Sequence, residues 1–185
     1  SSCTIAVNGD GTVQMVTGSV DIGGTRASTA MQAAEVLGLR AEEVHPMVGD
    51  TSSIGYTGVT GGSRTTFATG WAAYEAAQDV VRQMKERVAR LWETSVEEVE
   101  FAEGVFARKA KPAQRITFKE LCGRLMETGG PLVGKGTVSP RGVGPTFAHH
   151  IVDVEVDVET GKVEVLRYTA VQDVGKAVHP GYVEG

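Results

Sequence analysis

The chain has 185 residues, of which 41% are hydrophobic and 22% are charged, values typical of a globular protein with one domain or two small lobes. Its net charge of -5 argues against nucleic acid or an anionic membrane as a partner, and no apolar run approaches the ~18 residues of a membrane span. The two cysteines, Cys3 and Cys122, are too few for a four-thiolate iron–sulfur or zinc site, so we expect small buried side chains in a reducing cytoplasm.

The first third of the chain predicts a β-hairpin followed by a helix. Residues 4–7 and 12–16 flank Asn8-Gly9-Asp10-Gly11, whose Asn-Gly and Asp-Gly pairs favour the positive φ of a tight turn. A helix is expected from Thr25 to Leu37, with Gly38 ending it. The predicted buried face of this helix repeats at three and four residues and consists of Ala27, Ala30, Met31, Ala34 and Leu37.

A short strand, residues 44–48, is expected to lead into a long loop, residues 49–62. Loops of that length without structure of their own are usually functional. The longest helical pattern follows, from about Thr66 to Leu91, with its charged residues on a solvated side. Its predicted apolar stripe consists of Ala73, Ala77, Val80, Val81, Met84, Val88 and Leu91.

Glycine-rich segments precede both helices, and both segments suit an anionic group such as a phosphate. Gly23-Gly24-Thr25 opens the first helix, and Gly58-Val59-Thr60-Gly61-Gly62-Ser63-Arg64-Thr65-Thr66 leads into the second. Glycine lets the backbone approach a ligand, hydroxyls donate hydrogen bonds, and the first amides of a helix lack intrahelical partners. The alternative is a loop that ends in an N-cap without a ligand, which is the commoner arrangement. Neither segment has the Walker or dinucleotide glycine spacing.

The middle of the chain carries shorter signals. Residues 95–98 have capping-box spacing and predict a short helix, and residues 100–108 alternate around Glu103-Gly104 as a small hairpin does. The polar stretch 109–115 is where we place any boundary between lobes. A second capping box opens a helix over residues 117–127, whereas the glycine-rich residues 132–145 have no clear assignment.

The clearest strand pattern lies near the end of the chain, where residues 150–158 alternate and residues 163–171 return after the turn 159–162. His150 and four valines share one face, and a row of carboxylates occupies the other. That row is either the wet face of an antiparallel sheet or a metal site, and we favour the wet face because metal ligands must converge. No metal-ligand set is predicted anywhere in the chain. The carboxylates are Asp153, Glu155, Asp157 and Glu159.

Five segments, in this order, resemble those of a known family. Residues 18–25, Gly-Ser-Val-Asp-Ile-Gly-Gly-Thr, resemble its first cofactor loop, and residues 48–51, Val-Gly-Asp-Thr, resemble the strand and turn before its second. Residues 60–66 resemble the second cofactor loop, residues 154–161 a late hairpin, and residues 173–180 the entry to a third loop. The family is the molybdenum-cofactor-binding large subunit of the xanthine dehydrogenase and aldehyde oxidase type.

This resemblance implies an α+β fold, with β-hairpins, a mixed sheet and long helices after glycine-rich cofactor loops. Residues 1–185 would form part of a molybdopterin-binding domain. The implied cofactor is molybdopterin, in the cytosine dinucleotide form, and the implied reaction is hydroxylation of an N-heterocycle or aldehyde with water as the oxygen source. The rest of the large subunit and iron–sulfur and FAD domains or subunits are the implied partners. The residues assigned to cofactor contact are Gly23, Gly24, Thr25, Gly61, Gly62, Ser63, Arg64, Thr65 and Thr66, with Arg64 pairing with a phosphate or, alternatively, forming a salt bridge from the loop to a carboxylate.

The sequence also departs from the family. Gly24 stands where the family carries a Gln near the metal, and the catalytic Glu of the family is expected beyond Gly185, so no catalytic residue is assigned. We therefore expect the chain to be a piece of a longer polypeptide and to be inactive by itself. Two alternatives remain: a non-catalytic binding or structural module on the same scaffold, and a generic phosphosugar or nucleotide binder.

Overall fold

The computed structural model describes residues 1–49, 52–142 and 144–185, which form two compact units, Ser1–Arg141 and Gly142–Gly185. Asp50 and Thr51 of the predicted turn, and Val143 of the unassigned glycine-rich stretch, lie outside the described residues. Within the described residues, no helix has both the length and the apolar character needed to cross a membrane.

The first unit is built on a four-stranded sheet with the order β3-β2-β1-β7. Strands β1 (Ser2–Val7) and β2 (Val13–Thr17) form the antiparallel hairpin predicted around Asn8–Gly11. Strand β3 (Val44–Val48) coincides with the predicted strand and pairs with β2 in parallel, so the chain crosses over through a helix between them. Strand β7 (Leu132–Thr137) pairs antiparallel with β1 on the other side.

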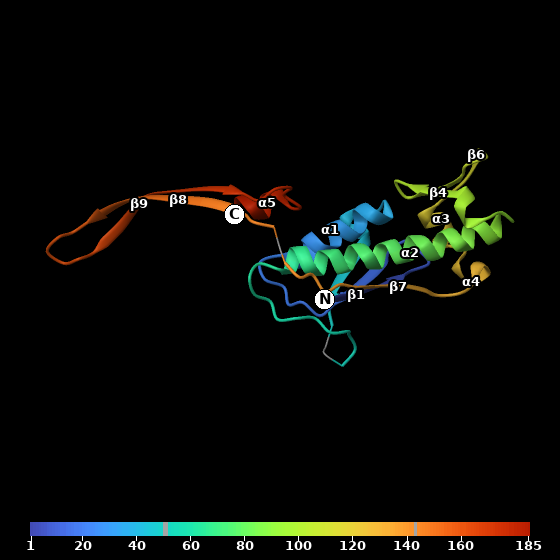
Figure 1. Ribbon diagram of the computed structural model, residues 1–185, viewed down its shortest axis with the longest axis horizontal. Helices are drawn as coiled ribbons and strands as arrows, with labels where there is room; N and C mark the ends of the chain where they lie inside the picture. Colours follow the sequence, from blue (N-terminus) through green and yellow to red (C-terminus); the bar gives the residue numbers. More distant parts are fainter. Residues whose placement is uncertain (50–51, 143) are drawn as a thin grey trace. The chain divides into compact units, whose positions relative to one another are not determined.

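Helices α1 (Thr25–Leu37) and α2 (Gly70–Leu91) lie side by side on one face of this sheet, α1 against β3 and α2 against β1 and β7 (Figure 1). Helix α1 has the predicted bounds, and Gly38 follows it with the left-handed φ of 65°. A π-helical turn, η2 (Thr65–Thr69), precedes α2. Both cysteines are free and buried, as expected. The core unites the sheet and helices and includes Ile5, Val13, Met15, Leu37, Val80, Met84, Val88, Phe106 and Phe118.

The buried faces of the two helices differ from prediction at single residues. In α1 the buried face is centred on Ala30, Ala33 and Ala34, whereas Ala27 and Met31 are only half-buried. Small residues at the centre of this face let α1 approach α2 closely. The periodic pattern of the sequence could not tell which of two adjacent faces of α1 would pack against α2. In α2 the predicted stripe is buried except for Leu91, which is half-buried at the helix end.

Strand β7 occupies the glycine-rich stretch that sequence patterns left unassigned. Gly134 and Gly136 lie directly beneath α2, and a Cβ at Gly136 would collide with the backbone of Ala72 and Ala76. A Cβ at Gly134 would collide with the Ala76 carbonyl oxygen in the same way. The glycines therefore serve close packing of helix on strand, a role that depends on a partner far away in sequence.

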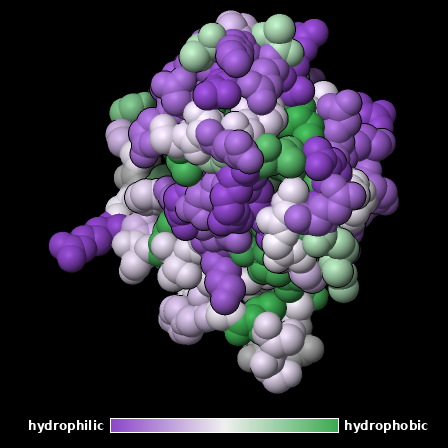
Figure 2. Space-filling view, turned by 90° about the vertical axis from the view of Figure 1, so that its right-hand side faces the viewer, coloured by the Kyte–Doolittle hydropathy of each residue, from purple (hydrophilic) through white to green (hydrophobic). Residues whose placement is uncertain are grey.

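The three-stranded sheet has the order β4-β5-β6, and its strands are β4 (Val99–Ala102), β5 (Val105–Arg108) and β6 (Lys111–Thr117). The predicted hairpin over 100–108 is confirmed by the β4–β5 pairing. The boundary predicted at 109–115 is wrong, because this stretch pairs with β5 inside the first unit. Figure 2 looks onto the end of the molecule that carries these strands, and shows a mostly hydrophilic surface with small, separate hydrophobic patches.

Two capping boxes were predicted, and one of them forms. The Thr117 hydroxyl accepts from the Glu120 amide at 3.2 Å, while the Thr117 amide donates to the Glu120 carboxylate at 2.8 Å. This capping box opens α3 (Phe118–Cys122), which is followed by α4 (Leu125–Thr128). Two short helices therefore replace the single helix that was predicted to end at Glu127. Ser95 precedes only a 3₁₀ turn, η3 (Val96–Glu98), and makes no side-chain capping bond to it. A similar turn, η1 (Ala41–Glu43), precedes β3.

The second unit contains the predicted late hairpin, β8 (Phe147–Val156) and β9 (Val163–Asp173), and the short helix α5 (Pro180–Glu184). The pairing shifts register between Asp153 and Val154, which marks a β-bulge. Both faces of the ribbon are exposed, the valine face as well as the carboxylate face. His179 is the N-cap of α5 and accepts a hydrogen bond from the Tyr182 amide at 3.2 Å.

Candidate cofactor site

The two glycine-rich loops of the first unit are brought to the same end of the helix pair. Helices α1 and α2 run in the same direction in Figure 1, so their N-terminal ends lie on one side. The hydroxyl of Ser19, in the first loop segment, is 2.5 Å from the hydroxyl of Thr69 in η2. The Gln32 side-chain amide of α1 donates to the Thr66 carbonyl oxygen at 3.3 Å. Segments about fifty residues apart in sequence thus form one local structure.

The first loop is held by a residue that sequence analysis did not single out, Asp21. Gly23 and Gly24 have φ values of 67° and 90°, which place both in the left-handed region. One oxygen of Asp21 accepts from the Gly24 amide at 3.0 Å, the Thr25 hydroxyl at 3.2 Å and the Arg26 amide at 3.4 Å. The Gly24 amide, predicted to contact the cofactor, therefore already has a carboxylate partner. An Asp a few residues before a helix is a recognisable capping signal.

The Asp21 clamp predicts a pH-dependent loop. Bonds from the Arg26 side chain, with smaller contributions from its amide and the Thr25 hydroxyl, hold the pKa of the Asp21 carboxyl below its usual range. Stabilisation by a carboxylate of lowered pKa is present above its ordinary value, ~3.9, and is lost as pH falls through the lower folded value. We therefore expect Asp21→Asn to lower the protection factors of the Gly24 and Arg26 amides at neutral pH, and acidification through the folded pKa of Asp21 to lower them in the unchanged chain. The measurement is residue-resolved amide exchange.

The matched control for this prediction is Asp10→Asn. Asp10 accepts from the Thr12 amide at 2.9 Å in the β1–β2 turn and has a similarly lowered pKa. Its replacement should leave the Gly24 and Arg26 amides unchanged. Equal exchange at Gly24 in both variants would remove Asp21 from the role of loop clamp.

The second loop presents an open backbone. Gly62 and Ser63 have successive positive φ values of 60° and 57°, and Gly61, Gly62 and Ser63 are exposed. A Cβ added at Gly61 or Gly62 would meet nothing within 4 Å. Packing within the described residues therefore requires neither glycine. The left-handed φ of Gly62 favours glycine by itself, whereas at Gly61 the approach of a ligand is the reason that is left.

A buried hydroxyl lies directly behind this loop. Thr65 is 4% exposed, and its hydroxyl has no hydrogen-bond partner among the described residues. Buried polar groups are normally satisfied, so such an atom is a candidate contact for an absent molecule. Thr66 is half-buried and lies one residue further into the π-helical turn.

Arg64 has two hydrogen-bond partners that the sequence did not indicate. Its guanidinium donates to the Gly58 carbonyl oxygen at 3.0 Å and to the Ser1 hydroxyl at 3.1 Å. The side chain thus ties its own loop to the start of β1, and among the described residues it forms no salt bridge with a carboxylate. With Ser1, Tyr56 and Gly58 it lines a cavity of about 390 Å³. Pairing of Arg64 with a phosphate stays a prediction, and it would use the guanidinium donors that these two bonds leave free.

The donor set fits an anionic organic cofactor better than a bare metal ion. Open glycine backbone, helix-start amides and threonine hydroxyls gather at one end of α1 and α2, whereas the described residues contain no cluster of three or more His, Cys, Asp or Glu suited to a metal. Backbone amides at helix N-termini suit phosphates. Any metal at this place would therefore be carried by the cofactor itself.

Comparisons with known proteins agree with this chemistry. A family model described as the molybdopterin cofactor-binding domain matches residues 1–185. The chain is 30% identical over 184 residues to the aldehyde oxidoreductase molybdenum-binding subunit PaoC of Escherichia coli, covering 97% of this chain and 24% of that protein. It is 26% identical over 167 residues to the carbon monoxide dehydrogenase large chain of Afipia carboxidovorans, covering 88% of this chain and 21% of that one.

Solved structures show the same fold. A Cu,Mo-containing CO dehydrogenase has a TM-score of 0.84 at 25% identity, covering 99% of this chain and 24% of that chain. Quinoline 2-oxidoreductase from Pseudomonas putida 86 has a TM-score of 0.81 at 25% identity, with the same coverage of 99% and 24%. The chain spans about a quarter of the length of these relatives. The predicted α+β fold is confirmed, and the chain belongs to the molybdopterin cofactor-binding domains of the xanthine dehydrogenase and aldehyde oxidase family.

Proposed function

We propose that this chain is the part of a molybdenum hydroxylase that holds molybdopterin, in its cytosine dinucleotide form. The intact enzyme would oxidise an N-heterocycle or aldehyde in the cytoplasm, with iron–sulfur and FAD centres on other domains or subunits. The observation that carries the proposal is the meeting of two glycine-rich helix starts at one end of α1 and α2. Relatives described as an aldehyde oxidoreductase and a probable hypoxanthine oxidase support the substrate class.

The residues of this chain have a binding and orienting role in the proposal. The cofactor, when bound, supplies the redox centre for hydroxylation. The backbone of Gly61 and Gly62 would approach it closely, and the hydroxyls of Thr65 and Thr66 would donate to its polar edge. Gly23, Gly24 and Thr25 would contact it from the first loop, in competition with the Asp21 carboxylate. The catalytic base is predicted beyond Gly185.

A non-catalytic module on the same scaffold is the second candidate. Two observations favour it: Gly24 offers no side chain where the family carries a Gln, and Asp21 already occupies the first-loop amides. In this alternative the loops are self-satisfied structural elements, and no molybdenum is retained by the protein.

The test is cofactor content rather than activity. The intact polypeptide that contains this chain would be produced in a host that makes molybdopterin, and its molybdenum and acid-released CMP would be measured per protein. Gly61→Ala should lower both by at least about tenfold, equivalent to about 1.4 kcal/mol of binding, since the new methyl group projects where the ligand lies. Gly61 has no positive φ and no neighbour within 4 Å, so the fold itself should not change.

Gly142→Ala is the matched control, because Gly142 likewise has no positive φ and no neighbour within 4 Å of an added Cβ. Its molybdenum and CMP content should equal those of the unchanged protein. An unchanged protein without molybdenum supports the non-catalytic module. Equal content in both alanine variants removes Gly61 from the contact set, and molybdenum without CMP rejects the cytosine dinucleotide form.

A further inference from the structure

Strand β7 is an edge strand, and its backbone pairing has a definite alternation. The Ser1 amine donates to the Val138 carbonyl oxygen and the Val138 amide donates to the Ser1 carbonyl oxygen, each at 2.9 Å. Because antiparallel pairing alternates, Gly136 and Gly134 also bond to β1, whereas the amides and carbonyls of residues 133, 135 and 137 point away from it. These outward groups form the free edge of the four-stranded sheet.

Side chains of α2 cover one half of that edge. The Gln83 side-chain amide donates to the Val133 carbonyl oxygen at 3.0 Å, and an Asp79 oxygen accepts from the Lys135 amide at 2.9 Å. Asp79 and Gln83 are four residues apart in the helix, and their partners Val133 and Lys135 are two residues apart in the strand. Four helical residues rise about 6 Å and two strand residues about 6.7 Å, so successive members of each series stay opposite one another.

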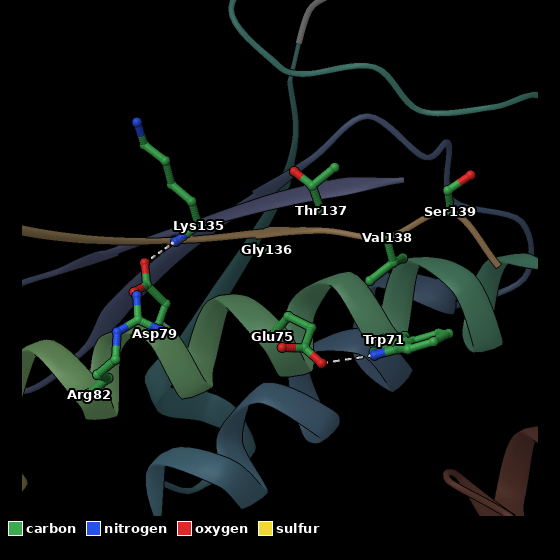
Figure 3. A pocket seen from close by; sticks show the side chains of 9 residues that line it. All are labelled: Trp71, Glu75, Asp79, Arg82, Lys135, Gly136, Thr137, Val138 and Ser139. Carbon is green, nitrogen blue, oxygen red and sulfur yellow. Dashed lines mark hydrogen bonds and ion pairs between the residues drawn. The ribbon is translucent and has the colours of Figure 1, made fainter.

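The next member of the α2 series, Glu75, does not cover the edge. Its carboxylate accepts from the Trp71 indole N–H at 2.9 Å instead, as Figure 3 shows. Among the described residues, no hydrogen bond is formed to the Thr137 amide or carbonyl on its outward side, or to the Lys135 carbonyl. A cavity of about 440 Å³ lies at this point, lined by Trp71, Glu75, Lys135, Thr137 and Ser139 among others.

We propose that the Lys135–Ser139 end of β7 is a strand-addition site, where an extended segment of the same polypeptide, outside residues 1–185, pairs with the sheet edge. The segment would accept from the Thr137 amide, donate to the Lys135 and Thr137 carbonyls, and pack against the Trp71 indole. The half of the edge covered by Asp79 and Gln83 limits the pairing to these few residues. This inference concerns assembly and does not depend on cofactor binding.

The chemistry of the site selects the kind of occupant. The unpaired groups are backbone donors and acceptors that recur every second residue, and an extended backbone matches that spacing. An exposed sheet edge is normally protected by side chains or by pairing with another strand. In β7 the α2 side chains cover Val133 and the Lys135 amide but not the residues that follow. Trp71 is 43% exposed beside the open half, and a partly exposed indole is a common anchor at interfaces.

The length of the relatives indicates where the segment that pairs with β7 comes from. This chain corresponds to about a quarter of each of them, so most of such a polypeptide lies outside the structure. A tethered segment has a high effective concentration, which makes a strand of only a few residues sufficient. A segment from a second copy of the chain would have to make the same contacts without the high effective concentration of a tethered one.

The test is photo-crosslinking in the intact polypeptide, with p-benzoylphenylalanine incorporated in place of Glu75. The matched control carries it in place of Glu86, an exposed residue on the same helix that does not line the cavity. Crosslinks from position 75 should map to one extended segment of the same molecule outside 1–185, and position 86 should not reach that segment. A dimer-sized product, no product, or a product confined to residues 1–185 would overturn the proposal.

Amide hydrogen exchange on the unsubstituted protein provides a second measurement. Strand addition should slow exchange of the Thr137 amide by at least about tenfold relative to an unprotected amide, bringing it close to that of Gly136. The Lys135 amide, which donates to Asp79, serves as the internal reference for a covered edge position. Exchange at Thr137 as fast as at an open loop amide would count against strand addition, whatever the crosslinking gives.

Discussion

Gly136→Ala is expected to destabilise the first unit by about 3 kcal/mol or more, the upper part of the range for inserting a methyl group into a packed interior. The added Cβ would collide with the Ala72 carbonyl oxygen and the Ala76 amide nitrogen, which are backbone atoms of α2 and cannot rotate away. The helix would have to separate from β7, which loosens the core residues Val80 and Met84. The measurements are the denaturant midpoint of unfolding and amide exchange in β1 and β7.

Gly9→Ala is the control for this substitution. Gly9 also lacks a positive φ, and an added Cβ there would make only an ordinary contact, 3.8 Å from the Cys122 carbonyl oxygen. Its effect should stay within about 1 kcal/mol. Equal denaturant midpoints for the two alanine variants would show that the packing of α2 on β7 does not require glycine at position 136.

Arg87→Met is expected to cost about 2–3 kcal/mol, because a buried guanidinium supplies hydrogen bonds that no other residue replaces. Arg87 is 7% exposed and donates to the carbonyl oxygens of Gly130 at 2.6 Å and Pro131 at 3.2 Å. It thereby joins the C-terminal part of α2 to the turn before β7. Burial lowers the pKa of this guanidinium, which is nevertheless charged at neutral pH, as arginine is throughout the physiological range.

Methionine retains much of the length of the arginine stem but no donor, so the partly buried carbonyl oxygens of Gly130 and Pro131 lose their partner while the desolvation cost of the charge is removed. The net loss is therefore smaller than the sum of the two bonds. Arg82→Met is the control on the same helix, since Arg82 forms an exposed ion pair with Asp79 and should cost under about 1 kcal/mol. Denaturant midpoints of the two variants distinguish a structural arginine from a surface one; equal midpoints would contradict the assignment.

Local chemistry was sufficient for the elements whose signals are contained within them. The Asn8–Gly11 turn, the α1 bounds with Gly38 behind the helix, and the Thr117 capping box were all predicted because each depends on φ preferences or on bonds within a few residues. The motifs also led to the correct family, since their order along the chain is itself sequence information. The contact set from Gly23 to Thr66 remains a prediction, because no cofactor contact is described in this structure.

Residues that depend on distant partners were beyond sequence analysis. The glycines of β7 made its strand unrecognisable in the sequence, because they are there to let α2 approach closely. Residues 109–115 resembled a domain boundary because they are polar, although backbone groups of this stretch pair with β5. Arg64 donates to the nearby Gly58 carbonyl and Ser1 hydroxyl, contacts that the sequence did not indicate, and its pairing with a phosphate stays a prediction. The sequence by itself determined the Asn8–Gly11 turn, the span of α1, the Thr117 capping box and the family, which follow from local preferences and motif order. Only the tertiary structure decided which faces are buried and which polar groups already have partners, because both depend on contacts between segments far apart in the chain.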